Sequence, residues 1–305
     1  MNKDFQNYLA PVCIFCYKRL DSLKSCIEKL LECKLSGETD VFIFSDGAKY
    51  IKDENEITEI RSYLQTIKGF KNVQLSFSEK NKGLAMSIIT GVSGILKKYG
   101  RVIVLEDDLI ASANFLVYMN QNLNFYANNS AVFSISGYSL PLKVPKNFKD
   151  DVYFLPRASS WGWASWVDRW EKIDWDMKDY AYFSNNKKLI KSFNIGGSDM
   201  AGMLKKQQQG IIDSWAIRWC YHQFKMDSYT AYPIISKIDN IGFTSEATNT
   251  NVYNRHKTPL DLHCKYDFVL PNKVTVNNEF LLQFQHFYSI KSRLIGKIKT
   301  IIKSI

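Results

Sequence analysis

The 305-residue chain lacks the sequence signals of several common protein classes. No G-x-G-x-x-G follows the first predicted strand and no G-x-x-x-x-G-K-[ST] occurs, which disfavours dinucleotide-binding oxidoreductases and P-loop enzymes. No window approaches the roughly 20 apolar residues of a membrane span, and the N-terminus has no apolar core of signal-peptide length. The six cysteines are irregularly spaced, and Cys13 and Cys16 have no second pair or nearby histidine that would favour zinc. These absences predict a cytoplasmic protein with reduced thiols.

Acidic residues are also in short supply. The chain has 40 Lys and Arg against 30 Asp and Glu, a formal net charge of +10. A basic balance suits nucleic acid, anionic lipid or phosphorylated substrates. Because no zinc finger, helix-turn-helix or RNA-binding motif stands out, we expect no nucleic-acid partner. A phosphorylated ligand and an anionic lipid surface remain as the expected partners.

Over the first 135 residues, apolar runs typical of strands alternate with patterns typical of helices. The predicted strands are 11–17, 41–45, 73–77, 102–105 and 131–136, and the predicted helices are 22–33, 57–67, 83–98 and 115–126. This alternation indicates βαβ units and an α/β fold with a mostly parallel sheet flanked by helices. The second half of the chain is less regular.

The most informative stretch is RVIVLEDDLI, residues 101–110, where an apolar run leads directly into Glu106, Asp107 and Asp108. The apolar run is typical of a strand buried on both faces. Three adjacent carboxylates repel one another unless a positive group lies between them, and Mg²⁺ or Mn²⁺ prefers such oxygen ligands. The pattern favours a metal-assisted site for a phosphorylated ligand. The alternative is a solvated acidic turn that starts the next helix.

Polar residues also follow the other predicted strands. Arg19 follows the first strand, Asp46 the second, and Asn81-Lys82-Gly83 the third. Because ligands of parallel sheets bind outside the carboxyl ends of the strands, these groups should share one edge with the acidic triplet. Together they suit a nucleoside diphosphate. The alternative is that loop residues are commonly polar.

Tryptophans are concentrated in RASSWGWASWVDRW, residues 157–170. We expect Trp161 and Trp163 in a turn, and Trp166 and Trp170 on one face of the helix that follows. Trp161, Trp163 and Trp215 are candidates for an aromatic wall against the apolar faces of a sugar. The alternative for all of them is core packing.

Asp213 lies in the segment IIDSWAIRWCYHQF, residues 211–224, just before a helical pattern. It has two interpretations, as a helix cap and as a general base beside an acceptor hydroxyl. His256 and His263 follow in a region of weak pattern, and we expect both at the surface.

The C-terminal residues form a basic amphipathic pattern. Its apolar stripe comprises Leu294, Ile295, Ile298, Ile301, Ile302 and Ile305. Residues 281–305 contain no acid and five Lys or Arg residues after position 290. This pattern predicts a helix that lies on an anionic membrane surface. The alternative is a helix packed on the domain.

Six segments carry a family resemblance, and in chain order they are PVCIFCYKR, VFIFSDG, NKGL, VIVLEDDLIASANFLVYM, SSWGWASWVDRW and IIDSWAIRW. With these segments the chain resembles the metal-dependent GT-A glycosyltransferases, which use nucleotide-diphosphate sugars. Within them the chain looks most like bacterial polysaccharide glycosyltransferases related to the eukaryotic alpha-1,3-mannosyl-glycoprotein beta-1,2-N-acetylglucosaminyltransferase. The likeness implies a Rossmann-like GT-A fold with a nucleotide-sugar-binding half over 1–135, an irregular acceptor-binding half over 136–265, and the amphipathic tail over 266–305.

The resemblance also implies a role for each residue on the donor side. Arg19 looks like the arginine that contacts the nucleotide, and Asp46 like the carboxylate that holds the uracil. Glu106 and Asp107 look like contacts to the donor sugar and the ribose, and Asp108 like the ligand of Mn²⁺ or Mg²⁺.

Lys82 and Gly83, which follow the third predicted strand, complete the donor side. By the same likeness, Asp213 looks like the catalytic base. The segment 240–242, Asn-Ile-Gly, leads to a histidine in many relatives, but residues 245–250 of this chain contain none.

The resemblance implies an inverting transfer from a UDP-sugar, with GlcNAc as the first choice, to a hydroxyl of a glycan acceptor. In view of the C-terminal pattern, we expect a lipid-linked acceptor and a peripheral location on the inner face of the cytoplasmic membrane, in polysaccharide synthesis. Two alternatives are a nucleotidyltransferase or phosphotransferase, and a non-catalytic carbohydrate- or membrane-binding protein.

Overall fold

The computed structural model describes residues 8–243 and 254–303. Its strands are β1 (Val12–Cys16), β2 (Asp40–Ser45), β3 (Asn72–Phe77), β4 (Arg101–Glu106), β5 (Leu109–Ala111), β6 (Val132–Ser136), β7 (Val152–Leu155), β8 (Trp163–Trp166), β9 (Tyr229–Pro233) and β10 (Ile238–Asn240). Its α-helices are α1 (Leu20–Leu31), α2 (Glu54–Leu64), α3 (Gly83–Tyr99), α4 (Phe115–Phe125), α5 (Val167–Trp170), α6 (Tyr180–Ser184), α7 (Lys187–Phe193), α8 (Met200–Gln208), α9 (Trp215–Lys225), α10 (Asn278–Phe287) and α11 (Ile290–Lys303).

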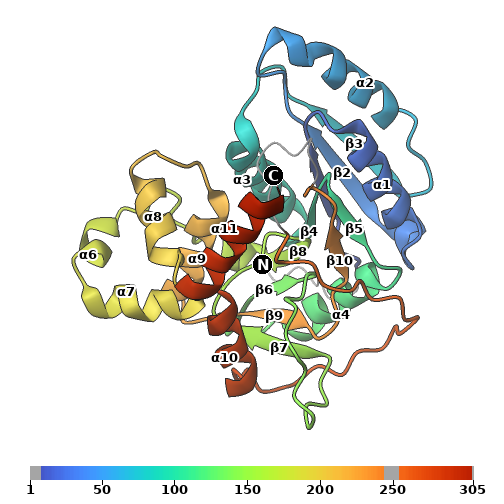
Figure 1. Ribbon diagram of the computed structural model, residues 1–305. Coiled ribbons are helices and arrows are strands. Elements are labelled where there is room, and N and C mark those ends of the chain that lie inside the picture. Colours follow the sequence, from blue (N-terminus) through green and yellow to red (C-terminus); the bar gives the residue numbers. More distant parts are fainter. Residues whose placement is uncertain (1–7, 244–253, 304–305) are drawn as a thin grey trace.

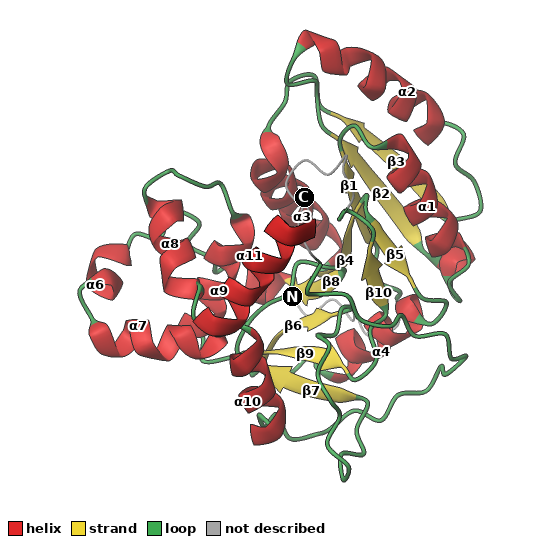
Figure 2. Cartoon of the chain, in the orientation of Figure 1, coloured by secondary structure: helices red, strands yellow, loops and turns green. Residues whose placement is uncertain are grey.

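A mostly parallel sheet runs through the molecule (Figures 1 and 2). Its strand order is β3-β2-β1-β4-β8-β6-β9-β7, and β5 pairs with β10 in a separate two-stranded ribbon. Every strand of the large sheet runs in one direction except β8, which is antiparallel to β4 and β6, and β7, which is antiparallel to β9. The expected α/β fold with a mostly parallel, helix-flanked sheet is confirmed.

Apart from the edge strand β3, the sheet is buried on both faces, and the strand residues alternate between them. Val12 and Ile14 of β1 pack with apolar residues of α1, α2, α4 and α10 on one face. Cys13 and Phe15 pack with residues of α3, α5 and α9 on the other. This double burial explains why β1 and β4 are continuous apolar runs rather than alternating patterns.

One feature differs from the expected layout, and two others add to it. Trp163–Trp166 forms strand β8 in the middle of the sheet, not a turn before a helix. The boundary expected after residue 135 falls inside β6, so the two halves share one sheet. The C-terminal region over 266–305 begins in the core, because Phe280 and Phe284 of α10 are 1% and 0% exposed.

The strand order reverses between β1 and β4. The chain adds β2 and β3 on one side of β1, whereas β4 lies on the other side. In open α/β sheets such a reversal leaves a crevice at the carboxyl ends of the two strands, where ligands bind. Among the helices of the described ranges, none has both the length and the apolar character required to cross a membrane.

Candidate functional site

The crevice between β1 and β4 holds an arginine in contact with two carboxylates. Arg19, just after β1, contacts Asp108 through Nη1 at 2.9 Å and Asp107 through Nη2. The backbone N–H of Tyr17 also donates to Asp107 Oδ2 at 3.3 Å. The fold thus brings together groups that lie about 90 positions apart, as expected from the strand-end pattern.

The three carboxylates outnumber their one arginine partner, and their protonation reflects this. Burial, with the charges of Asp108 and Asp107, raises the pKa of Glu106 to about 8. Burial also raises the pKa of Asp107 to about 6, although Arg19 opposes the shift. Since a raised pKa means that the charged form is disfavoured, additional positive charge here would relieve an electrostatic cost.

The donor set suits a hard divalent cation that takes only a few ligands from the protein. Asp108 is the more accessible of the paired carboxylates, with 13% of its side chain exposed against 4% for Asp107. Within the described part of the chain, no three His, Cys, Asp or Glu side chains are grouped to enclose a metal ion. A Mg²⁺-type ion commonly uses one or two carboxylates and completes its shell with substrate phosphates and water, and Asp108 fits that pattern.

A segment far along the chain closes the other side of Asp108. The ribbon of β5 and β10 aligns Asn240 with Leu109, and the N–H of Ile241 donates to the backbone oxygen of Asp108 at 3.0 Å. Gly242 lies so close that a Cβ there would collide with the Asp108 carboxylate. The resemblance had pointed to the Asn-Ile-Gly segment over 240–242, but it did not predict a contact with Asp108.

Asp46 organises the loop that leads into α3. Its carboxylate accepts the backbone N–H groups of Gly47, Lys82 and Gly83 at 2.9 to 3.1 Å. A Cβ on Gly47 would lie 2.6 Å from the backbone carbon of Lys80, so this position requires glycine. The first N–H groups of α3 are therefore occupied by Asp46, and the Gly83 amide is not offered to a ligand.

A cavity of about 150 Å³ lies beside Asp46, between β2, β3 and α3. Its lining is rich in hydroxyl groups, including those of Ser45, Ser78 and Thr90, with Phe44 as the aromatic member. Since Ser78 and Thr90 donate their hydroxyl protons to the backbone oxygens of Lys80 and Met86, these two hydroxyls face the cavity as acceptors, and Phe44 adds one ring face.

The expected aromatic wall is wrong for two of its three members. Trp163 and Trp215 are 1% and 3% exposed, and their rings pack in a cluster with Trp170 and Trp219. All four residues of β8 are buried, and Trp163 lies on the face of the strand that packs against α9, so neither side chain can stack on a sugar. Trp161 alone is half-buried, in edge contact with Tyr138.

Asp213 is not the cap of α9. The N-cap residue is Ser214, whose hydroxyl accepts the N–H of Ile217 at 3.3 Å. The Asp213 side chain is 67% exposed and pairs with Arg218 at 3.2 Å. The capping interpretation is therefore excluded, and the carboxylate is accessible.

The two histidines behave differently. His263 is at the surface as expected, with 74% of its side chain exposed. His256 is half-buried, and its ring lies 5.4 Å from that of Trp161. Burial, helped by the charge of Arg255, lowers the pKa of His256 to about 4. His256 is therefore a neutral packing residue rather than a surface group.

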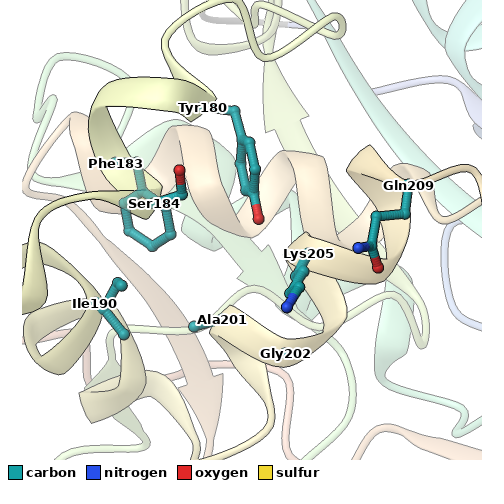
Figure 3. Close-up of a pocket in the computed structure, with 8 residues that line it drawn as sticks. All are labelled: Tyr180, Phe183, Ser184, Ile190, Ala201, Gly202, Lys205 and Gln209. Atoms are coloured by element: carbon teal, nitrogen blue, oxygen red, sulfur yellow. The ribbon is translucent and has the colours of Figure 1, made fainter.

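A larger cavity of about 540 Å³ lies apart from these groups, between α6, α7 and α8 (Figure 3). Its lining includes Tyr180, Phe183, Ile190 and Lys205 and contains none of the predicted site residues. The cavity belongs to the helical lobe at the left of Figure 1 and not to the edge of the sheet.

No protein-family model and no curated protein sequence matches the chain. Solved structures show partial similarity. They include the mannosyltransferase PcManGT from Pyrobaculum calidifontis in complex with GDP-Man and Mn²⁺, with 12% identity, a TM-score of 0.39, and coverage of 55% of this chain and 48% of that one. TarS from S. aureus has 8% identity, a TM-score of 0.42, and coverage of 75% and 36%. Mouse xyloside xylosyltransferase 1, in its apo form, has 9% identity, a TM-score of 0.38, and coverage of 74% and 84%.

The chain matches about half or less of the length of the first two of these structures. All three similarities are partial, and the function proposed below therefore depends on the residues of this chain.

Proposed function

We propose that the protein is a metal-dependent, inverting glycosyltransferase of the GT-A type. It moves a sugar from a UDP-sugar to a hydroxyl of a glycan acceptor in surface-polysaccharide synthesis, and UDP-GlcNAc is the first donor to test. The observation that carries the proposal is the contact of Arg19 with both Asp107 and Asp108 at the crevice between β1 and β4. An acidic cluster with one arginine at this point suits a diphosphate bound together with a cation.

The donor would lie along the carboxyl edge of the sheet. Asp108 would hold Mn²⁺ or Mg²⁺, which when bound supplies Lewis-acid charge to the diphosphate. Glu106 and Asp107 face the donor sugar and the ribose. The nucleobase enters the cavity beside Asp46, and the hydroxyl groups that line this cavity can pair with the polar edge of the base.

Arg19 and Lys82 contribute positive charge to the donor side. As the bond between the sugar and the phosphate breaks, negative charge grows on the leaving UDP, and fixed positive groups stabilise it. Because Asp46 already occupies the N–H groups of Lys82 and Gly83, the Lys82 side chain is the group of this loop that reaches the diphosphate.

Asp213 acts as the general base. It accepts the proton of the acceptor hydroxyl while that oxygen forms a bond to the anomeric carbon on the face opposite UDP. The bond between the anomeric carbon and the phosphate oxygen breaks at the same time, so an α-linked donor gives a β-linked product. The accessible carboxylate, oriented by Arg218, is suited to meet an acceptor from solvent.

Thermal unfolding with a panel of nucleotide sugars, with and without Mn²⁺, tests the donor site. A ligand at a hundredfold excess over its Kd stabilises the protein by about 2.7 kcal/mol. We expect a UDP-sugar to raise the melting temperature only with Mn²⁺, and Asp108→Ala to abolish the rise. Asp267→Ala, at an exposed position, is the control. An unchanged response of Asp108→Ala would exclude this cation site.

Product analysis tests the reaction. Release of UDP with a new β-glycosidic bond supports sugar transfer, whereas release of pyrophosphate would indicate nucleotidyl transfer. Asp213→Asn should abolish transfer and leave the affinity for the UDP-sugar within a few-fold. Sugar binding that ignored both Mn²⁺ and UDP would instead favour a non-catalytic carbohydrate-binding protein.

The proposal includes a lipid-linked acceptor and a peripheral position on the inner face of the cytoplasmic membrane. The part of the structure that bears on this position is α11.

A further inference from the structure

Helix α11 packs on the protein through its small and polar residues. Ser292, Gly296 and Thr300, spaced four apart on one face, are all half-buried. A Cβ on Gly296 would lie 3.6 Å from Cδ of Arg255, and Arg293 donates to the Ser198 hydroxyl at 3.3 Å. Figure 1 shows α11 lying across the front of the molecule, from α10 toward α3.

The opposite face of α11 is apolar and exposed. Ile290, Leu294 and Ile298, again four apart, are 65%, 54% and 56% exposed, and Ile295 beside them is 46% exposed. An amphipathic helix of a soluble domain normally turns its apolar stripe toward the core. Here the stripe faces away from the protein, and exposed patches of this kind mark interaction sites.

The charges around this stripe identify its partner. On a helix with 100° between residues, Lys297 and Lys299 lie on opposite borders of the stripe, and Lys291 lies within it. No acidic residue follows Glu279. A second copy of the chain docked face to face would set these positive charges against themselves. A nucleic acid would pair with the lysines but leave the isoleucines in water.

We infer that α11 attaches the protein to an anionic membrane surface. Its apolar face enters the boundary between headgroups and acyl chains, and Lys291 and Lys297 contact lipid phosphates. Because Phe280 and Phe284 of α10 are buried in the core, α11 follows directly from an element that is packed into the protein. The inference rests on α11 and does not require the proposed transferase activity.

Sedimentation with lipid vesicles tests the inference on the full chain without any substrate. We expect binding to vesicles that contain phosphatidylglycerol, little binding to pure phosphatidylcholine, and weaker binding as salt increases. The double variant Leu294→Gln/Ile298→Gln should bind about tenfold more weakly or worse, because it removes two apolar side chains from the stripe. Ile51→Gln/Leu262→Gln, at positions 85% and 86% exposed elsewhere, is the matched control and should bind as the wild type.

Circular dichroism and thermal unfolding of both double variants establish that each is folded. Equal binding by Leu294→Gln/Ile298→Gln and the wild type would overturn the inference, as would binding that is indifferent to anionic lipid. A dimer in analytical ultracentrifugation that the α11 variant dissociates would assign the face to a second copy instead. The response of the same variants to a UDP-sugar and Mn²⁺ reports separately on the donor site.

Discussion

Replacing Glu106 with glutamine should stabilise the protein at alkaline pH in the absence of any cation. Glutamine matches the protonated glutamic acid in shape but carries no charge to be buried beside Asp107 and Asp108. In the wild type, the pKa of Glu106 rises from 4.5 to about 8, first because of burial and then because of the two neighbouring carboxylates. The effect therefore depends on pH, and its sign can be stated in advance.

Between about pH 4.5 and pH 8 the unfolded chain releases the Glu106 proton while the folded protein retains it. The folded state then binds more protons than the unfolded state, so the free energy of unfolding falls as pH rises through this range. At 1.36 kcal/mol per pH unit, the shift sets an upper value of about 5 kcal/mol. Since solvent reaches part of this half-buried side chain, we expect Glu106→Gln to gain about 2–4 kcal/mol at pH 8–9 and almost nothing at pH 5.

Urea unfolding of both proteins at pH 5, about 7 and about 9, in the presence of a chelator, measures this difference. Glu59→Gln, at an exposed position of α2, is the control and should show no gain that grows with pH. Adding Mn²⁺ and UDP should reverse the order at pH 8, since the bound cation favours the ionised carboxylates of the wild type. If Glu106→Gln and the wild type unfold alike at every pH, the carboxylates do not bear the electrostatic cost described here.

Three further substitutions test other contacts of the site and of the fold around it. Gly242→Ala should weaken Mn²⁺-dependent donor binding about tenfold or more, as measured by calorimetry, because the new Cβ collides with the carboxylate of Asp108. Asp46→Ala should lower the free energy of unfolding in urea by about 1–2 kcal/mol, because the backbone N–H of Gly47 and those of Lys82 and Gly83 at the start of α3 lose their acceptor. Asp261→Asn should lower it by about 3–5 kcal/mol, because Lys237 then stays buried without its ion-pair partner.

Gly242→Ala and Asp261→Asn each have a matched comparison. Gly94→Ala, where a Cβ would meet nothing within 4 Å, should leave donor binding unchanged. Glu32→Gln removes an exposed pair with Lys29 and should cost less than about 1 kcal/mol. Hydrogen bonding and Lys237 lower the pKa of Asp261 from 3.8 to about 2, although burial opposes this shift. The contribution of Asp261 to the free energy of unfolding should therefore be present at neutral pH and disappear only as pH falls through that range.

The parts of the fold that follow from local pattern could be predicted from the sequence. The helix expected over 83–98 is α3, and the strand expected over 102–105 lies within β4, because long amphipathic and continuous apolar runs determine their own structure. The same reasoning predicted that Arg19 and the acidic triplet share an edge, since parallel strands place their carboxyl ends together. The structure places Arg19 in contact with Asp107 and Asp108.

Pattern reasoning failed where long-range pairing overrides local preference. The segment containing Trp163 becomes a strand only because it pairs with both β4 and β6, and no local signal specifies that position. The orientation of its tryptophans follows from that pairing, so the wall expected from Trp163 and Trp215 could not be distinguished from core packing in advance. The face through which α11 packs on the protein could not be predicted either, because an amphipathic pattern does not determine which face of a helix contacts the rest of the protein.

The surroundings of Asp108 show why only part of a site can be predicted from a sequence. One half, from β1 and β4, consists of charged residues at strand ends, and such residues stand out after apolar runs. The other half consists of Asn240, Ile241 and Gly242, whose contribution is backbone geometry set by the pairing of β10 with β5 across about 130 positions. The N–H of Ile241 fixes the main chain at Asp108, and the missing side chain of Gly242 leaves room for its carboxylate. Since a backbone contact depends on where the chain passes rather than on a reactive side chain, it becomes identifiable only once the fold is known.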